Sequence, residues 1–355
     1  MRYKSGNNEM KRFVTSTCLL VFLSLFLSSC QSRDEKFSPE KFQIERTSVK
    51  FPFEVKELIA FDGGYVCNFE NLEDTTFHIG ILDNTFHLLK QKTRQLNKGL
   101  QFLRAIWTDH NTLFAIDVNT IKYWRNGQWN LYKVLPKEDR TTFSSYELNY
   151  PIFEDDQFIV RSCSKGEFGG AIFFKNKKTG KTYSCEATSL KAVHKIDGVY
   201  YVSSSLVHGC GFAKVIQIAD PRKLYEIKNR SQGCNCGWYD IYPKDPYDDQ
   251  IKHPIGYDKG FKVLLDTTAI EITGAFVSKQ HLYHIFADSK NTYLGYIDHQ
   301  KPVVLDTIVN KPLWFGSIRD LQSNPNLFVI YNRHFNGVIV RKKNKIRLIK
   351  FERTT

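Results

Sequence analysis

Residues 102–133 read FLRAIWTDHNTLFAIDVNTIKYWRNGQWNLYK. They contain four short runs of apolar and aromatic residues separated by polar ones: 102–107, 112–116, 121–124 and 129–133. Runs of this length and composition predict β-strands. Asn126-Gly127 lies between the last two runs and suits the positive backbone dihedrals of a tight hairpin turn. These residues therefore predict a four-stranded antiparallel meander.

Similar meanders can be drawn along most of the chain between Val55 and Phe351. We expect their second strands to centre on Cys67, Phe114, Val160, Val202, His284 and Val329. The successive intervals are 47, 46, 42, 82 and 45 residues, so the repeat length lies in the forties. Four strands at this period resemble the β-propeller families, in which each blade packs its faces against its neighbours.

The resemblance implies an all-β fold, namely a β-propeller of four-stranded antiparallel blades. Six blades are visible, and seven are the alternative. The sequence has no tryptophan–aspartate repeat ending, no paired-glycine kelch mark and no sialidase-type aspartate box, so it indicates no subfamily. A pair of β-sandwiches is the rival architecture, and the even strand spacing argues against it.

The interval of 82 residues between Val202 and His284 is close to two repeats. Within it, residues 229–268 form either a seventh, degenerate blade or a long insertion. We favour the insertion, because three prolines in this range disfavour central strands: Pro243, Pro246 and Pro254.

The N-terminal region has the pattern of an export signal. Lys11 and Arg12 precede an apolar run at 13–27 that is too short and too rich in serine for a comfortable membrane span. Leu27-Ser28-Ser29-Cys30 resembles the lipobox of bacterial lipoproteins, which implies cleavage before Cys30 and a diacylglycerol group on its thiol. An ordinary secretory signal or an uncleaved helix is the alternative.

We therefore expect a lipoprotein signal peptide at residues 1–29, a tether at 30–54 and a propeller domain at 55–355. Met10 fits the true start of the signal, since the residues before it are polar. Arg33-Asp34-Glu35 resembles the short signals that send some Bacteroidetes lipoproteins to the cell surface. The expected location is the cell envelope, anchored by lipid to the outer membrane on its periplasmic or its surface face.

The formal net charge is +13, but the lysines and arginines are scattered and no nucleic-acid motif is present. We expect no nucleic-acid partner. The expected partners are the membrane, through the N-terminal lipid, and a glycan, a peptide or an envelope protein.

An exported protein can form disulfides. The candidates in the body are Cys163, Cys185, Cys210, Cys234 and Cys236. Cys163 and Cys185 are expected in neighbouring strands of one repeat and form the plausible pair, while Cys210 with Cys234 or Cys236 would join the insertion to its sheet. These thiols with His208 could instead bind a soft metal, but their spacing is not that of a zinc knuckle. We expect no metal and no cofactor.

The insertion carries the candidate ligand-binding residues, which offer flat apolar faces to a sugar or a peptide: Trp238, Tyr239, Tyr242 and Tyr247. Long insertions between regular elements often carry function. The alternative is a packed surface loop.

We predict a binding or scaffold module more readily than an enzyme. The alternative is an envelope glycan hydrolase with carboxylates in the propeller channel, for which the candidates are Asp62, Asp117, Asp240 and Asp288. Nothing local marks one of them as the acid and another as the base, and no Gly-x-Ser-x-Gly motif is present. We expect structural roles for the histidines in strand patterns: His78, His87, His194, His281 and His284.

Overall fold

The computed structural model describes residues 38–70, 77–109, 111–134, 152–164, 169–206, 211–227, 259–314, 326–332 and 335–353. The chain divides into Met1–Glu40 and Lys41–Thr355, and the fold below is that of the second unit. The expected signal peptide and Cys30 lie outside the described residues. Within the described part, no helix is long and apolar enough to cross a membrane.

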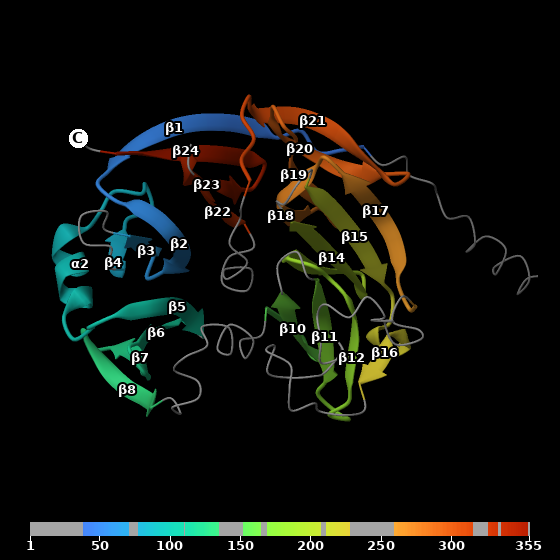
Figure 1. Cartoon of the computed structure of the whole chain (residues 1–355). Coiled ribbons are helices and arrows are strands. Elements are labelled where there is room, and N and C mark those ends of the chain that lie inside the picture. Colours follow the sequence, from blue (N-terminus) through green and yellow to red (C-terminus); the bar gives the residue numbers. More distant parts are fainter. Residues whose placement is uncertain are drawn as a thin grey trace, which may run out of the picture. The chain divides into compact units, whose positions relative to one another are not determined.

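Six small β-sheets follow one another around a ring, which is the architecture of a six-bladed β-propeller (Figure 1). This confirms the predicted fold class. The first blade comprises β2 (Glu54–Phe61), β3 (Gly64–Glu70) and β4 (Phe77–Leu82). The second comprises β5 (Leu103–Asp109), β6 (Thr112–Asp117), β7 (Thr120–Arg125) and β8 (Gln128–Val134). The third comprises β9 (Phe153–Glu154), β10 (Phe158–Ser164), β11 (Gly170–Asn176), β12 (Thr182–Glu186) and β16 (Tyr225–Ile227).

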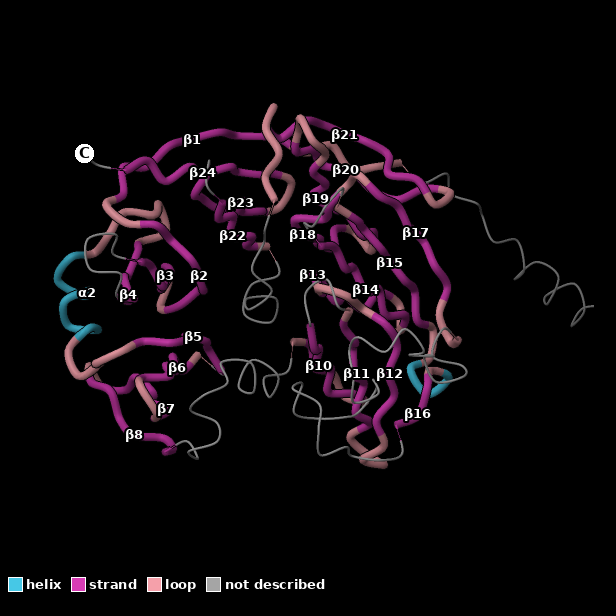
Figure 2. Tube along the Cα trace, viewed as in Figure 1, coloured by secondary structure: helices cyan, strands magenta, loops and turns pink. Residues whose placement is uncertain are grey.

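The other three sheets have four strands each. The fourth blade comprises β13 (Leu190–Ile196), β14 (Val199–Leu206), β15 (Phe212–Ile218) and β17 (Lys262–Thr268). The fifth comprises β18 (Glu271–Ser278), β19 (His281–Ala287), β20 (Thr292–Asp298) and β21 (Lys301–Val309). The sixth comprises β22 (Leu327–Asn332), β23 (Phe335–Lys342), β24 (Lys345–Arg353) and β1 (Gln43–Phe51). Figure 2 shows how little helix accompanies these strands; the described helices include α2 (Lys90–Asn97) and the short η3 (Pro221–Lys223).

The second blade matches the meander predicted from residues 102–133. Its four strands pair in sequence order, and β7 and β8 are joined by Asn126 and Gly127, whose φ angles are 54° and 76°. Both values lie in the left-handed region that a two-residue hairpin turn requires.

The ring closes through its N-terminal strand. β1 pairs with β24 in parallel register, from Gln43 opposite Lys345 to Phe51 opposite Arg353. Arg46 extends the closure to the fifth blade, because its Nε and Nη2 donate to the carbonyls of Ile308 (2.6 Å) and Thr307 (2.8 Å).

This closure corrects two expectations. Residues 43–51 belong to the sixth blade, and not to the tether assigned to 30–54. Val329 lies in β22, which is the first strand of its blade and not the second. The other five expected centres fall on second strands: β3, β6, β10, β14 and β19.

The insertion expected at 229–268 ends earlier than the sequence indicates, since 262–268 form β17. The chain leaves the third blade after β16, and its described part resumes beside η3 before β17. Gly260 packs closely against η3, since a Cβ added to it would lie 2.5 Å from the carbonyl oxygen of Lys223. Both described ends of the excursion therefore lie at outer strands of neighbouring blades. Residues 228–258 lie outside the described part.

The hydrophobic core is divided among the seams between blades. Apolar clusters of described residues span the seams of blades one and two, three and four, four and five, five and six, and six and one. At the seam of blades five and six, Gly274 permits close packing, because a Cβ there would lie 2.3 Å from the ring of Phe328. Burial of these seams is the main stabilising contribution in a fold of this kind.

Candidate functional site

The aromatic residues expected to bind a ligand lie outside the described residues, as do several of the sulfur and histidine candidates: Trp238, Tyr239, Tyr242, Tyr247, His208, Cys210, Cys234 and Cys236. Across the described ranges, no three side chains of His, Cys, Asp or Glu gather into a possible metal site.

The expected Cys163–Cys185 disulfide is wrong. Cys185 is a buried free thiol on β12, and burial raises its pKa to about 12. Cys163 lies on β10, and β11 runs between the two strands. Two strand spacings of about 4.8 Å exceed the Cα separation that a disulfide tolerates.

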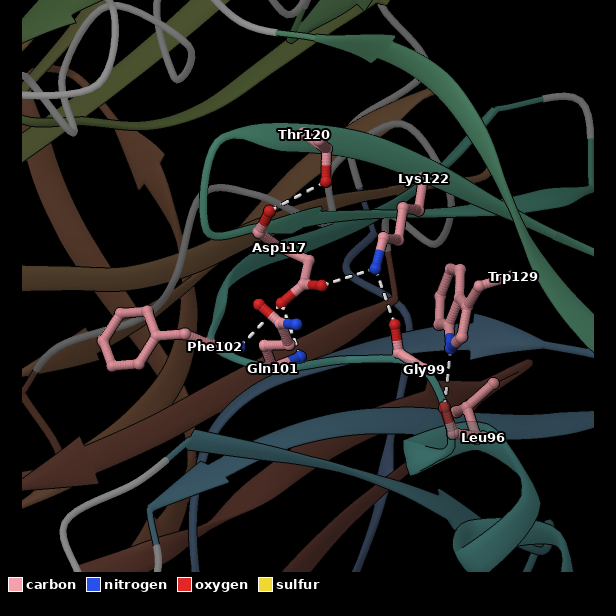
Figure 3. Close-up of polar contacts among 8 residues, drawn as sticks. All are labelled: Leu96, Gly99, Gln101, Phe102, Asp117, Thr120, Lys122 and Trp129. Carbon is pink, nitrogen blue, oxygen red and sulfur yellow. Dashed lines mark hydrogen bonds and ion pairs between the residues drawn. The ribbon is translucent and has the colours of Figure 1, made fainter.

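Asp117, one of the carboxylates considered for hydrolysis, has a structural environment (Figure 3). Its side chain is 2% exposed, and its Oδ1 accepts hydrogen bonds from the backbone N–H groups of Gln101 (2.8 Å) and Phe102 (2.7 Å). Lys122 Nζ donates to its Oδ2 at 2.6 Å and also to the carbonyl of Gly99. These contacts fix the entry into β5 and leave little of the carboxylate accessible.

The other described carboxylates of that set also have local partners. Asp62 is exposed and lies 3.7 Å from Lys92. Asp288 Oδ1 accepts from the backbone N–H groups of Lys290 (2.7 Å) and Asn291 (2.6 Å) in the turn after β19. Asp240 lies outside the described residues.

Two of the strand histidines are buried between the fourth and fifth blades. His194 Nε2 lies 2.9 Å from the carbonyl of Ala275, and His284 Nε2 lies 3.0 Å from Ser203 Oγ. Burial lowers the pKa of both, and the nearby His194 helps to lower that of His284 to about 3. Both are therefore neutral at physiological pH, as structural residues joining two blades.

The innermost strands share a feature that the sequence analysis missed. Register shifts near their starts leave one residue unopposed in β2, β5, β13 and β18: Lys56, Arg104, Lys191 and Thr273 respectively. Such bulges at the edge of a sheet redirect a side chain out of the regular alternation. Because the innermost strands of a propeller start at the same face of the ring, these four positions lie around one end of its axis.

The backbone beside two of these bulges is held by side chains. Asn336 bonds to both the N–H (3.0 Å) and the carbonyl (2.8 Å) of Val55, and Ser205 Oγ accepts from the N–H of Ile272 at 3.0 Å. The bulges are therefore supported from neighbouring blades and are rigid features of the inner rim.

Lys191 and Glu271 form the most unusual pair at this rim. They lie at the starts of β13 and β18, on neighbouring blades, and are only 9% and 6% exposed. Burial lowers the pKa of Lys191, while the charge of Glu271 opposes that shift. Burial likewise raises the pKa of Glu271 to about 7 against the opposing effect of Lys191.

The pair is not bonded within the described part of the chain: no hydrogen bond or short ion pair there involves either charged group. Gly211, at φ 71°, leaves the space that the carboxylate occupies, since a Cβ there would lie 2.8 Å from Glu271 Oε1. An ammonium and a carboxyl group held apart and poorly solvated are available to a ligand that brings both an acceptor and a donor.

A sequence signal for this rim exists in retrospect. Val55-Lys56-Glu57-Leu58, Leu103-Arg104-Ala105-Ile106 and Leu190-Lys191-Ala192-Val193 repeat one pattern of apolar, basic, variable and apolar residues. In a regular strand, residues three positions apart face opposite sides, so a pair of core residues at this spacing indicates a bulge between them.

The fold and the inner rim together define this protein as a six-bladed β-propeller with a polar inner edge. No protein-family model and no curated protein sequence matches the chain. Among solved structures, it is similar to the extracellular domain of a one-component system from B. thetaiotaomicron, with 9% identity and a TM-score of 0.32, covering 85% of this chain and 40% of that one.

Two further similar structures have comparable scores. The surface component PorZ of the type-IX secretion system of Porphyromonas gingivalis has 12% identity and a TM-score of 0.29, over 79% of this chain and 46% of that one. The N-terminal domain of Nup159 has 9% identity and a TM-score of 0.28, over 81% of this chain and 72% of that one. This chain thus spans less than half the length of the two bacterial structures.

Proposed function

We propose that this protein is a lipid-anchored β-propeller of the cell envelope that acts as a binding or scaffold module. The observation that carries the binding role is the pair formed by Lys191 and Glu271, two nearly buried ionisable groups on neighbouring inner strands. Among the described residues neither charged group has a bonded partner, and a ligand that bonds to both would offset the free-energy cost of their burial.

The chemistry of the pair favours a ligand with a carboxylate beside a hydroxyl or N–H donor. Lys191 would donate to the carboxylate, and Glu271 would accept from the neighbouring donor. The carboxyl end of a peptide and an acidic sugar both have this arrangement. The ligand class is thus that of peptides or acidic glycans of the envelope.

The insertion is the second element of this proposal. It leaves the third blade after β16 and returns through β17, the outermost strand of the fourth blade, whose innermost strand β13 carries Lys191. Trp238, Tyr239, Tyr242 and Tyr247 would supply flat apolar faces to the same ligand. Deleting 233–250 should then weaken binding, and unchanged affinity would remove the insertion from the site.

The anchor is tested by replacing Cys30 with serine. The wild-type protein should partition into the detergent phase of Triton X-114 and incorporate labelled palmitate, because each buried methylene of an acyl chain contributes about 0.8 kcal/mol of membrane affinity. The Cys30→Ser variant should remain in the aqueous phase without label. An unlabelled wild-type protein would rule out the anchor.

The binding role is tested with a panel of short peptides with free carboxyl termini and of oligogalacturonides, by isothermal titration calorimetry. Lys191→Met should weaken binding about tenfold or more, the effect expected for loss of one charge-assisted hydrogen bond. Lys262→Met, on the exposed outer strand β17 of the same blade, is the matched control. Equal affinities of wild type and Lys191→Met, or no binding by the wild type, would contradict the proposal.

A further inference from the structure

The second blade carries most of the exposed large apolar side chains. Among the described residues these are Phe102, Val118, Leu131, Tyr132, Val134 and Val304, and all but Val304 lie in or beside β5–β8. Leu131, Tyr132 and Val134 are 61%, 64% and 53% exposed, and all three belong to β8. A concentration of apolar surface on one blade marks an interaction site more strongly than scattered apolar residues do.

β8 also presents an open backbone edge. It is the outermost strand of its sheet and, within the described ranges, pairs with β7 alone. In a two-residue hairpin the residues flanking the turn, here Arg125 and Gln128, form a hydrogen-bonded pair. Pairs alternate from there as far as Leu131, opposite Lys122, which directs its N–H and carbonyl away from β7. The register then shifts, and Tyr132 is a bulge residue without a partner on β7.

Among the described sheets, one blade has a strand beyond its fourth. The third blade has β16 as a fifth, outermost strand, whereas β1, parallel to β24, is the fourth strand of the sixth blade and takes the same position as β8 in its own. In the first blade, α2 lies beyond β4 and the backbone N–H of Leu89 bonds to the carbonyl of Ile81 on that strand. Addition of a fifth strand to the outer edge of a blade is therefore a geometry that this fold accommodates once within its described residues, in the third blade.

The side chains of β8 indicate the chemistry of a strand that would pair with its outer edge. Tyr132 packs edge-on against Phe114 at 5.5 Å between ring centroids, while its body remains exposed. The charged residues of the β7–β8 hairpin that are exposed are Arg125 and Lys133, and β8 itself contains no acidic residue. Apolar side chains alternating with carboxylates would complement this edge.

The unpaired backbone groups of β8 favour an extended polypeptide over a lipid surface as the partner that binds there. The outward N–H and carbonyl groups of β8 would have no hydrogen-bond partner in the hydrocarbon of a membrane, at a cost of several kcal/mol per group. An extended polypeptide satisfies them by main-chain pairing, and its side chains supply the specificity.

We propose that β8 is a docking edge for an extended segment of a partner protein in which apolar and acidic residues alternate. The segment adds to the second blade as a fifth strand and covers Leu131, Tyr132 and Val134. Its carboxylates face Lys133 and Arg125.

The test uses a fluorescein-labelled octapeptide of alternating valine and glutamate, with the valine–lysine peptide as its charge control, and measures anisotropy against the full-length protein. The valine–glutamate peptide should bind, and the valine–lysine peptide should bind about tenfold more weakly. No saturable binding of the first peptide up to about 1 mM would overturn the proposal.

Three variants separate the parts of the edge. Leu131→Pro removes the outward N–H without removing a bond to β7 and should abolish binding, and Lys133→Glu should weaken it about tenfold. Val304→Ser, an exposed apolar residue on β21 of the fifth blade, is the control and should bind like wild type. Circular dichroism verifies that each variant is folded. Tyr132→Ser replaces Leu131→Pro as the test if the proline variant does not fold, and retained affinity in the folded variant used would overturn the proposal.

Two other occupants are tested in the same experiments. Binding to phosphatidylglycerol vesicles that is lost in Lys133→Glu, with no peptide binding, would assign this surface to a membrane and overturn the proposal. Concentration-dependent sedimentation that disappears in Leu131→Pro, again with no peptide binding, would identify a second copy of the chain as the occupant and also overturn it.

Discussion

At the scale of single residues, Glu271 is a carboxyl group whose protonation depends on the fold. Its pKa of about 7 exceeds the ordinary value near 4.5, chiefly because it is buried. The native protein therefore holds a proton on this carboxyl between about pH 4.5 and 7 where the unfolded chain has lost it. Its contribution to stability is present at the acidic end of this range and is lost as the pH rises through it.

Glu271→Gln should remove this dependence. Neutral glutamine keeps the shape without the buried charge, so the variant should be more stable than wild type at pH 8 and lose less stability between pH 5 and 8. Urea unfolding at a series of pH values measures the effect. An equal change of the unfolding free energy with pH in the two proteins would show that the carboxyl group is well solvated.

Asp155 shows the opposite shift, in the turn between β9 and β10. Burial alone would raise its pKa, but hydrogen bonds from Lys195 Nζ (2.7 Å) and the Tyr200 hydroxyl outweigh it and lower the pKa to about 2. Lys195 also lies 4.9 Å above the Tyr200 ring. These contacts join the third blade to the fourth.

Asp155→Asn should destabilise the protein by about 1–3 kcal/mol at pH 7, because Lys195 loses its buried partner. The native carboxylate is favoured at neutral pH, and its contribution is lost as the pH falls from about 4 through 2. The difference in unfolding free energy between wild type and variant should therefore shrink in acid. Asp156→Asn, at the exposed neighbour, is the control; an equal loss in both variants would contradict this account.

At the scale of elements, the close approach of β18 and β22 depends on a missing side chain. A Cβ on Gly274 would lie 2.3 Å from Cδ1 of Phe328, which is itself buried. Packing in such a seam has little free volume, so the neighbour has to move when an atom is added.

Gly274→Ala should cost about 1–3 kcal/mol through overpacking, and Phe328→Leu in the same chain should recover part of that loss. The double-mutant cycle, measured by thermal and urea unfolding, gives the coupling between the two sites. Additive effects of the two substitutions would show that they do not meet in solution.

At the scale of the whole molecule, the ring depends on one strand from near the start of the chain. β1 pairs with β24 and is further tied by Arg46 to β21 and by Glu45 to Lys345 at 2.7 Å. Closure removes the exposed edges that an open propeller would leave, and it joins the two ends of the repeat array.

Arg46→Met should lower the free energy of unfolding by about 1–2 kcal/mol, since two carbonyls of β21 lose a charged donor. Removal of residues 38–51 should have a far larger effect, with loss of cooperative unfolding. Calorimetry measures both, and Lys50→Met at the exposed end of β1 is the control. A cooperative transition in the shortened chain would show that β1 is dispensable for the ring.

The site was predictable only in part. His194 and His284 have the structural roles expected of strand histidines, whereas the pairing of Cys163 with Cys185 failed because an intervening strand separates them. The approach of Lys191 to Glu271 was missed, because the two residues are 80 positions apart and meet only through the packing of neighbouring blades. The aromatic residues of the insertion remain a prediction.

The sequence by itself determined the strands and their order within most blades, because alternation of apolar residues and turn residues such as Asn126-Gly127 act between near neighbours. Only the tertiary structure decided that residues 43–51 complete the sixth blade, that bulges redirect Lys56 and Lys191, and that β8 pairs with β7 alone among the described strands. These features arise from contacts between segments up to about 300 residues apart, as between Glu45 and Lys345, and local composition carries no record of such partners.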